Sequence, residues 1–475
     1  MDGLGDCDMN AANGCETNLR TSATSCGVCG RACPGGGVCT NGACPGEDWA
    51  RAVGSAIGDE FGVAAAATAA TGDVYLVGDY DASLTLAGMN LTVSGISDAF
   101  VAAFDAVGTP RWIRRIGGAS EDHGQGIAVD RMGNVYVVTT VTGSADLGGG
   151  APVAGGTSGA LAVSSFTPAG TLRWSRRAGN SIDTDGLGVT TDAAGNVYVT
   201  GRFTGSVDFG GGALDAGTVG TAGVIVSYDN AGTFRWALHA PGGRASFWDV
   251  GFDASGNGVI AGTFSGSVTV SGMALSAAGS YDILTVGVTT TGTRRWARAW
   301  GSTGDEYAFR VAVDTTGEAY LSGRFLSPSI AFGTDTLTNA ASTTSDVFVA
   351  SLTSMGDARW ARRFGGTTDD GGTSIAIDTT HVVHAGGWFR GTVPFGSTSL
   401  TSAGLTDGFL VSLGADGTVR RARRFGAASN DEVIGVATLG PSILVAGDFN
   451  ATATFGSTPL TSAGGADAFI ARLPP

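Results

Sequence analysis

The sequence predicts an all-β protein built from seven similar units, and three observations support this prediction. Glycine supplies 80 of the 475 residues, and Thr, Ser and Val are abundant, which favours short strands and tight turns over long helices. Six tryptophans recur at intervals of 60 to 64 residues. Alternating apolar runs, separated by Asp, Gly and Asn, fill each interval.

The tryptophan interval marks an internal repeat. The six positions are Trp49, Trp112, Trp174, Trp236, Trp296 and Trp360. Their surroundings read WARAVG, WIRRIG, WSRRAG, WALHAP, WARAWG and WARRFG, and a seventh copy, RARRFG, begins at Arg421. Self-similarity at a fixed period is the signature of a repeat architecture, so we expect seven copies of one structural unit.

Each copy is expected to contain four strands in a constant order. Strand a resembles GIAVD, strand b NVYVTG, strand c DAFVA and strand d WIRRIG. The segments from Asp130 to Asn134 and from Asp192 to Asn196 carry the residue types of hairpin turns. The acidic loop between strands d and a separates one copy from the next.

Seven four-stranded units can bury both faces of every sheet by packing radially around an axis. Strand a is rich in small residues, as in GVAAAA at 62–67, which suits a crowded axis, and the bulky Trp stands on strand d. The chain begins this region with a lone strand d at Trp49 and ends it with a lone strand c at 467–472. We therefore predict a seven-bladed β-propeller over residues 49–475, closed by pairing of its first and last strands.

All seven cysteines lie in a short N-terminal stretch, at positions 7, 15, 26, 29, 33, 39 and 44. This density predicts a small disulfide-rich module over residues 1–44, a linker at 45–48 and an extracellular or cell-surface location. A zinc site is disfavoured, because the stretch has one C-x-x-C and no histidine occurs before position 123. The opening MDGLGDCDMN lacks a secretion signal, so we expect the natural N-terminus to lie upstream.

The repeated pattern resembles a known family. W-x-R-x-(F/A)-G, the acidic loop, D-x-x-G-N-V-Y-V-x-G and S-A-G-x-x-D-x-F-V are similar to the bacterial SBBP-type β-propeller repeat across residues 49–475. The segments CDMNAANGCETNL and CGVCGRAC resemble cysteine-rich modules of secreted and surface proteins of myxobacteria. These resemblances imply the fold and an extracellular setting, and they imply no particular activity.

Six of the seven loops between strands d and a carry a pair of acidic residues. The copy containing Trp236 lacks one. In one interpretation each carboxylate caps its own loop by accepting backbone N–H bonds. In the other, the ring of carboxylates binds Ca²⁺, since hard cations prefer oxygen ligands. The candidate ligands for such a metal site are Asp305, Glu306, Asp369 and Asp370.

The sequence favours a binding or scaffold protein without catalytic activity. The net charge of −15 argues against nucleic acid, and no apolar run is long enough to span a bilayer. We expect a monomer that binds an extracellular protein or a polysaccharide through long loops between strands b and c, at 142–157, 204–221 and 390–406. The aromatic residues that do not recur, Trp248, Trp300 and Trp388, are the candidate ligand contacts. The alternative is a secreted polysaccharide hydrolase or lyase with its site on the same loops.

The odd number of cysteines generates a testable expectation. At most three disulfides can form among the seven, and we assign them to Cys15, Cys26, Cys29, Cys33, Cys39 and Cys44. Cys7 would keep a free thiol, because its partner lies upstream. Alkylation followed by mass spectrometry should find one modified cysteine. Seven modified cysteines would mean a reduced module and would contradict the extracellular location.

Overall fold

The computed structural model describes residues 48–474 except 180–182, 218–219, 342 and 457, together with 4–5, 17–18 and 21–22. In the N-terminal region β1 (Leu4–Gly5) pairs with β2 (Thr17–Asn18). The cysteines, and with them the expected disulfides of Cys15, Cys26, Cys29, Cys33, Cys39 and Cys44, lie outside the described residues. The described residues include no helix that is long and apolar enough to cross a membrane.

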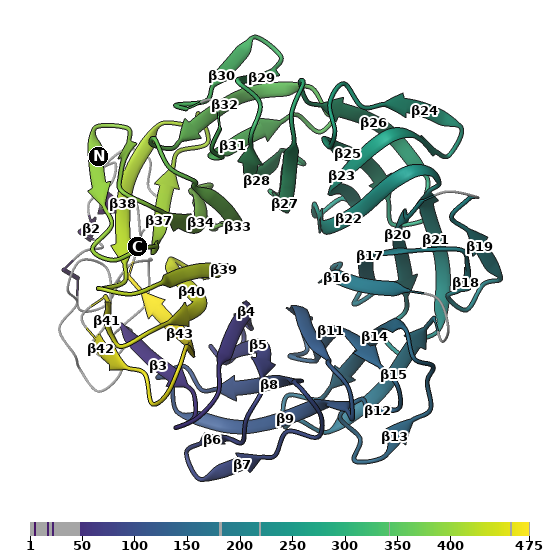
Figure 1. Ribbon diagram of the computed structural model, residues 1–475, viewed down its shortest axis with the longest axis vertical. Helices are drawn as coiled ribbons and strands as arrows, with labels where there is room; N and C mark the ends of the chain where they lie inside the picture. The colour runs from purple at the N-terminus through teal and green to yellow at the C-terminus, as the bar shows by residue number, and fades with distance from the viewer. Residues whose placement is uncertain are drawn as a thin grey trace.

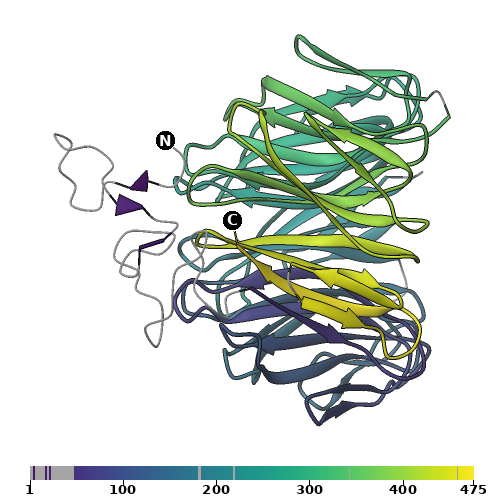
Figure 2. The same cartoon turned by 90° about the vertical axis from the view of Figure 1, so that its left-hand side faces the viewer.

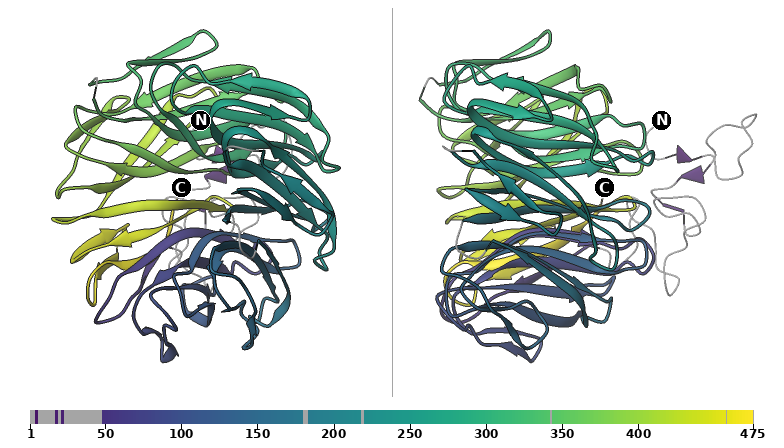
Figure 3. Two further views of the ribbon diagram at one scale, coloured as in Figure 1. Left: turned by 45° about the vertical axis from the view of Figure 1, so that its right-hand side comes forward. Right: turned by 90° about the vertical axis from the view of Figure 1, so that its right-hand side faces the viewer.

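Seven antiparallel sheets stand around a central axis, and each blade has a four-stranded core (Figure 1). The chain is an all-β, seven-bladed propeller, as predicted. Strand a of every blade faces the axis and strand d lies at the outside of the ring (Figure 1). The side views show the same blades edge-on (Figures 2 and 3).

The blades are numbered from the first complete set of strands, and each is given in the order a, b, c, d. Blade 1 has β4 (Glu60–Ala67), β5 (Val74–Tyr80), β8 (Asp98–Phe104) and β9 (Pro110–Gly118). Blade 2 has β10 (His123–Val129), β11 (Val135–Thr142), β14 (Gly159–Phe166) and β15 (Leu172–Ala178). Blade 3 has β16 (Thr184–Thr191), β17 (Val197–Phe203), β20 (Ala222–Tyr228) and β21 (Phe234–Ala240). Blade 4 has β22 (Gly242–Phe252), β23 (Asn257–Val270), β25 (Asp282–Thr289) and β26 (Arg294–Trp300).

The remaining blades follow the same order. Blade 5 has β27 (Glu306–Val313), β28 (Ala319–Phe325), β31 (Asp346–Leu352) and β32 (Ala358–Phe364). Blade 6 has β33 (Gly371–Ile377), β34 (Val383–Phe389), β37 (Asp407–Leu413) and β38 (Val419–Phe425). Blade 7 has β39 (Asp431–Leu439), β40 (Ser442–Phe449), β43 (Asp467–Leu473) and, from the start of the domain, β3 (Trp49–Val53).

Blade 7 closes the ring without a covalent link between its last two strands. β3 pairs antiparallel with β43, in a register that runs from Trp49 opposite Arg472 to Val53 opposite Ala468. β43 pairs on its other side with β40. The two ends of the domain therefore lie side by side in one sheet (Figure 1).

The long segments between strands b and c form β-structure of their own. Five contain a separate hairpin: β6 (Leu84–Leu86) with β7 (Met89–Leu91), β18 (Ser206–Asp208) with β19 (Ala213–Asp215), β29 (Ser329–Phe332) with β30 (Asp335–Thr338), β35 (Thr392–Phe395) with β36 (Thr398–Thr401), and β41 (Thr452–Phe455) with β42 (Thr458–Thr461). In blade 4, β24 (Met273–Ser276) pairs with the extended end of β23. In blade 2, β12 (Ala145–Asp146) pairs with β13 (Pro152–Val153) and with β9 of blade 1.

These hairpins cover the rim. Their inward side chains, such as Phe209, Phe332 and Phe395, are buried in the cores between blades. The segments 142–157, 204–221 and 390–406, expected as loops that supply a ligand surface, are thus partly ordered β-structure that seals the outside of the ring.

The repeated tryptophan joins each blade to the next. In six blades the indole Nε1–H donates to a main-chain carbonyl in the c-to-d turn of the following blade, at 2.8 to 3.2 Å. The ring also lies flat against that turn's glycine, where the backbone has positive φ. A Cβ at Gly232, for example, would stand 2.6 Å from the ring of Trp174. The indole, the turn glycine and the turn carbonyl together form what we call the tryptophan slot.

The arginine two residues after the tryptophan completes the joint. Arg114 Nε donates to the carbonyl of Gly170 at 2.9 Å, and its guanidinium lies 5.7 Å from the centre of the Trp112 ring. Arg51, Arg176 and Arg362 make the same two contacts. These rim arginines therefore link neighbouring blades.

The seventh copy has Arg421 in place of tryptophan, and the ring closure explains this. Blade 6 would direct its tryptophan at the c-to-d turn of blade 7, but β43 and β3 come from opposite ends of the domain and no such turn joins them. Arg423, two residues further on, donates instead to the carbonyl of Pro474 at 3.1 Å. The irregular copy thus follows from where the ring is closed.

A pair of glycine substitutions tests the tryptophan slot. Gly232 and Gly440 both have positive φ, but a Cβ at Gly440 meets no atom within 4 Å. Gly440→Ala should lose only about 1 to 2 kcal/mol of unfolding free energy, the cost of left-handed backbone. Gly232→Ala should lose about 1 to 3 kcal/mol more, because the new methyl displaces the Trp174 ring. Denaturant unfolding of the two variants measures the difference, and equal losses would contradict a structural role for the slot.

Candidate functional site

The d-to-a and b-to-c connections share one face of the ring, which we call the mouth face. Parallel bridges join them, as between Ser97 and Glu121 and between Tyr281 and Asp305. Strand a of every blade carries a β-bulge near this face. Bulges often re-aim a side chain beside a functional site. The seven bulged residues are Val63, Gln125, Leu187, Trp248, Phe309, Thr373 and Ile434, and all of them line a cavity of about 280 Å³ at the mouth of the axial channel.

The bulge position differs in every blade, although most of the repeat is stereotyped. Two positions beside it lie opposite each other on strands a and b. The one on strand a also differs in every blade, and the one on strand b carries four residue types. Their pairs are Phe61 and Asp79, His123 and Thr140, Asp185 and Arg202, Ser246 and Thr263, Tyr307 and Arg324, Gly371 and Trp388, and Glu432 and Asp448. Three variable positions per blade thus surround the mouth, which makes it aromatic on blades 4 to 6 and acidic on blades 7 and 1.

An aromatic cluster crosses from blade 4 to blade 5. Tyr281 stacks on Tyr307 at 5.8 Å, and Tyr307 stacks on Phe309 at 5.8 Å with nearly parallel rings. Trp248 meets Phe309 edge-on at 5.4 Å, and its Nε1–H donates to Thr263 at 3.1 Å. We call these four residues the aromatic cluster. Such rigid, half-exposed rings are typical of ligand-binding surfaces.

Of the three tryptophans singled out in the sequence, two lie at the mouth. Trp248 and Trp388 line the same cavity, and Trp388 lies over Gly371, where a Cβ would come within 2.7 Å of its ring. Trp300 is elsewhere, on the outer strand β26. There it stacks on Phe332 at 5.5 Å and donates to Thr285 at 3.0 Å. The structure therefore does not bring Trp300 together with the other two.

Arginines stand among these rings. The Arg324 guanidinium lies 5.4 Å from the centre of the Tyr307 ring and 5.8 Å from that of Phe309. Arg310 follows the bulged Phe309 and lines both the mouth cavity and the channel. Arg244 lines a second cavity, of about 250 Å³, together with Trp248, Tyr281 and Tyr307. Trp248 borders both cavities, so they adjoin along its ring.

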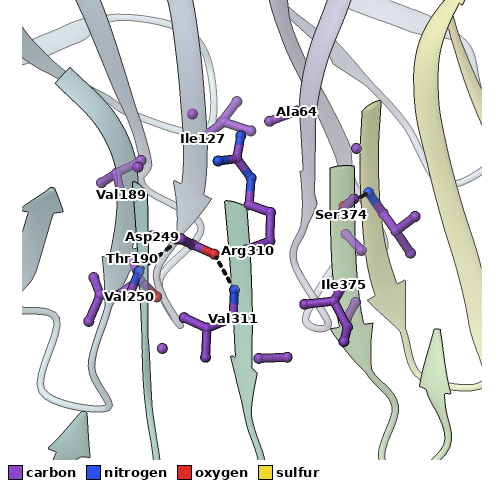
Figure 4. Close-up of a pocket in the computed structure, with 18 of the residues that line it drawn as sticks. Ala64, Ile127, Val189, Thr190, Asp249, Val250, Arg310, Val311, Ser374 and Ile375 are labelled. Atoms are coloured by element: carbon purple, nitrogen blue, oxygen red, sulfur yellow. Dashed lines mark hydrogen bonds between the residues drawn. The ribbon is translucent and has the colours of Figure 1, made fainter. Parts of the chain in front are cut away.

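The axial channel continues the mouth cavity into the protein. It has a volume of about 340 Å³ and is lined by strand a of all seven blades. Asp249 forms part of its wall: one carboxylate oxygen accepts the N–H of Val250 at 2.9 Å and the other that of Val311 at 3.0 Å (Figure 4). Burial raises the pKa of Asp249. Figure 4 shows the Arg310 side chain extending away from this carboxylate into the channel.

The acidic pairs of the d-to-a loops cap those loops in the structure. Asp370 accepts the N–H of Gly366 at 2.8 Å with one oxygen and that of Arg390 at 3.0 Å with the other. Asp122 and Asp431 tie their own loops to the end of strand b in the same way. Each capping residue therefore holds the d-to-a and b-to-c connections together on the mouth face.

The residues expected to bind calcium are engaged in such contacts. Glu306 accepts the N–H of Ser302, Asp305 the hydroxyl of Tyr307, and Asp369 the N–H of Ser345. Within the described ranges no three His, Cys, Asp or Glu side chains are grouped so that they could hold a metal ion. Calcium binding by Asp305, Glu306, Asp369 and Asp370 stays a prediction.

Two carboxylates on blade 7 repel each other. Glu432 and Asp448 stand opposite each other on β39 and β40, and Asp448 is only 7% exposed. Like charges directly opposite on paired strands are destabilising. Burial, and then the carboxylates of Glu432, Asp431 and Asp59, raise the pKa of Asp448 to about 8. Burial also raises the pKa of Glu432.

This raised pKa predicts how stability depends on pH. The unfolded chain releases the Asp448 proton near its ordinary pKa of about 4, while the folded protein keeps it up to about 8. The contribution of Asp448 to the free energy of unfolding is therefore fully present below pH 4, and it is lost as the pH rises through about 8. Asp448→Asn should melt higher than the unaltered protein at pH 9, and this advantage should be much smaller at pH 5, where only about one of the four pH units between the two pKa values has been crossed.

The matched control is Asp416→Asn. Backbone hydrogen bonding from Thr418 lowers the pKa of this surface carboxyl, so its removal should give no gain at pH 9. Melting curves at the two pH values measure both effects. An Asp448→Asn variant without any advantage at pH 9 would show that Asp448 ionises in the folded protein without cost.

Comparison with known proteins agrees with this architecture. Residues 111–140, which run from β9 to β11, match the family model described as SBBP, beta-propeller repeat. Regulatory protein FlaEY of Caulobacter vibrioides is 26% identical over 188 residues, which cover 38% of this chain. The match spans 20% of the length of that protein.

Three solved structures are similar in arrangement at low sequence identity. A polysaccharide lyase described as an ulvan lyase has 14% identity and a TM-score of 0.44, covering 88% of this chain and 97% of its own. The endosialidase of phage phi92 has 9% identity and a TM-score of 0.42, covering 90% and 69%. A protein of unknown function from Bacteroides caccae has 10% identity and a TM-score of 0.35, covering 68% and 89%. The repeat match and the ring of blades together identify the chain as a seven-bladed β-propeller that carries the SBBP beta-propeller repeat.

Proposed function

We propose that this protein is an extracellular or cell-surface binding propeller without catalytic activity, whose ligand occupies the channel mouth on blades 4 to 6. The observation that carries the proposal is the pattern of variation between blades. Positions that recur in the blades serve joints and caps, whereas the two strand a positions at the mouth differ in every blade and the strand b position opposite carries four residue types. Variation on an otherwise repeated scaffold is expected where a surface must fit one particular ligand.

The aromatic cluster supports this location. Trp248, Tyr307 and Phe309 stand on paired strands, so the sheet and its neighbours restrict their positions before any ligand arrives. A site held by rigid elements loses little conformational entropy on binding. Adjoining cavities of about 250 and 280 Å³ are individually close to the lower end of the range for small-molecule sites. A polysaccharide or an extracellular protein segment could lie across both.

The alternative, a secreted polysaccharide hydrolase or lyase, requires an acid and a base beside the bound chain. Two carboxylates stand beside the aromatic cluster: Asp305 accepts the hydroxyl of Tyr307, and Asp249 uses both oxygens to accept backbone N–H bonds of the channel wall. The acidic pair of Glu432 and Asp448 stands on blade 7, across the ring from blade 4 (Figure 1). The geometry therefore favours binding over catalysis.

The experiment uses substitutions that the repeat itself supplies. Blade 3 has Leu187 where blade 4 has Trp248, and blade 6 has Thr373 where blade 5 has Phe309. The double variant Trp248→Leu and Phe309→Thr should therefore fold. Glycan and extracellular-protein arrays, probed with the unaltered protein, identify ligands, and the double variant should bind them at least about tenfold more weakly.

The control is Ile434→Leu, a change at the same bulge position on blade 7. It should leave array binding unchanged, and circular dichroism melting curves should show that both variants are folded. Array ligands that bind the double variant as tightly as the unaltered protein would place the site elsewhere and contradict the proposal.

A further inference from the structure

Three arginines at the mouth form no close ion pair among the described residues, although the charge of Arg310 acts on the buried Asp249. Within the described part of the chain, no carboxylate forms an ion pair with Arg244, Arg310 or Arg324. The Arg310 guanidinium donates only to the carbonyl of Phe309, at 3.2 Å. The buried Nε of Arg324 has no hydrogen-bond partner among the described residues. A buried donor left unpaired is costly, so a partner for it is expected.

The arginines at the mouth differ from the rim arginines in standing among aromatic rings that border a cavity. Acidic residues number 42 against 27 basic ones, so most arginines could find a carboxylate close by. Among the described arginines outside the mouth, Arg115, Arg363 and Arg424 pair with the buried aspartates that begin strand c, and the rim arginines donate to main-chain carbonyls of the next blade. The mouth on blades 4 and 5 thus gathers three arginines against one buried carboxylate, Asp249, in a protein of net charge −15. Such a local field favours an anionic ligand.

Arginines and aromatic rings alternate along the adjoining cavities. Arg244 lies at one end with Tyr281, Trp248 stands between the two cavities, and Arg324 and Arg310 border the mouth. The Arg324 guanidinium lies directly over the Tyr307 ring, 5.4 Å from its centre, so a positive charge and an apolar surface stand side by side. A groove of this kind offers an apolar surface and an anion-binding group to each successive unit of an extended ligand.

We propose that the ligand at the mouth is an acidic saccharide, and this inference rests on the proposed binding function. A uronic acid residue has an apolar ring face that packs on an aromatic side chain and a carboxylate that an arginine can bind with two parallel hydrogen bonds. Sulfated sugars offer the same combination. A nucleic acid strand is disfavoured, because its long run of phosphates would be repelled by the net negative charge outside the mouth.

The test is calorimetric titration of the whole chain. Hexagalacturonate is the probe, and its fully methyl-esterified form is the neutral counterpart with the same backbone. A sulfated galactan hexasaccharide distinguishes sulfate from carboxylate recognition. Hexaglutamate and oligothymidylate represent acidic peptides and nucleic acid. At least one acidic saccharide should bind, and the ester should bind at least about tenfold more weakly than hexagalacturonate if the carboxylate is the group recognised.

The variants separate charge from shape. Arg324→Thr places at this position the residue that blades 2 and 4 carry, Thr140 and Thr263, and Arg244→Gln removes charge from an exposed side chain. Each should weaken binding of the acidic saccharide about tenfold or more. Arg131→Gln removes an exposed arginine from the a-to-b turn of blade 2, on the opposite face, and should change nothing.

Each other outcome overturns the inference. If neutral saccharides bind as tightly as the acidic ones and only Trp248→Leu weakens them, the binding function stands and the acidic ligand is wrong. If hexaglutamate or oligothymidylate binds in place of the saccharides, the ligand class is wrong. If no acidic saccharide binds at millimolar concentration, the inference fails, and the array experiment with the double variant decides separately whether the mouth is a binding site.

Discussion

The tryptophan slot is the contact on which the rest of the ring depends. A blade of four strands has two faces to bury, and the slot fixes how the rim of one blade meets the turn of the next. The indole brings apolar area, one hydrogen bond to a turn carbonyl and a flat surface that requires glycine beneath it. Because the same contact recurs at six joints, the small residues of strand a can approach the axis at a constant angle.

With the joints satisfied by residues that repeat, the mouth is free to vary. The capping carboxylates hold the loops of the mouth face against the sheet edges, as Asp122 and Asp370 do. Between them the bulged residues can be Trp in one blade and Thr or Ile in another without loss of the ring. Along strand a, the residues that line the channel are small and similar between blades, whereas the residues at the mouth differ from blade to blade.

Much of the fold could be predicted from the sequence, because the blade is specified locally. The tryptophan interval, the turn residues and the alternating runs identified the seven units, four strands in each and the incomplete first and last copies. The rim hairpins were not anticipated, because their strands are three or four residues long and their apolar positions are buried only against a neighbouring blade. The loss of tryptophan at Arg421 was noted as an irregularity, and only the missing turn of blade 7 explains it.

The site was less accessible to sequence reasoning. Trp248 and Trp388 were found because they do not recur, yet the same reasoning selected Trp300, whose place on the rim depends on packing against Phe332. Tyr281, Tyr307, Phe309 and Arg324 were missed. Comparing the seven copies position by position would have revealed three of them, since the bulge position and the pair beside it stand out by their variety.

The closure of blade 7 also decides how the ring responds to force. The start of β3 and the end of β43 are registered neighbours, Trp49 opposite Arg472, so both tethers leave the ring at one point. Tension applied through the two ends would break the hydrogen bonds between β3 and β43 one after another, beginning at Trp49 and Arg472. Such a geometry resists pulling poorly compared with strands sheared along their length. Tension between the two ends would therefore open blade 7 first, while the five tryptophan joints between blades 1 and 6 remain closed.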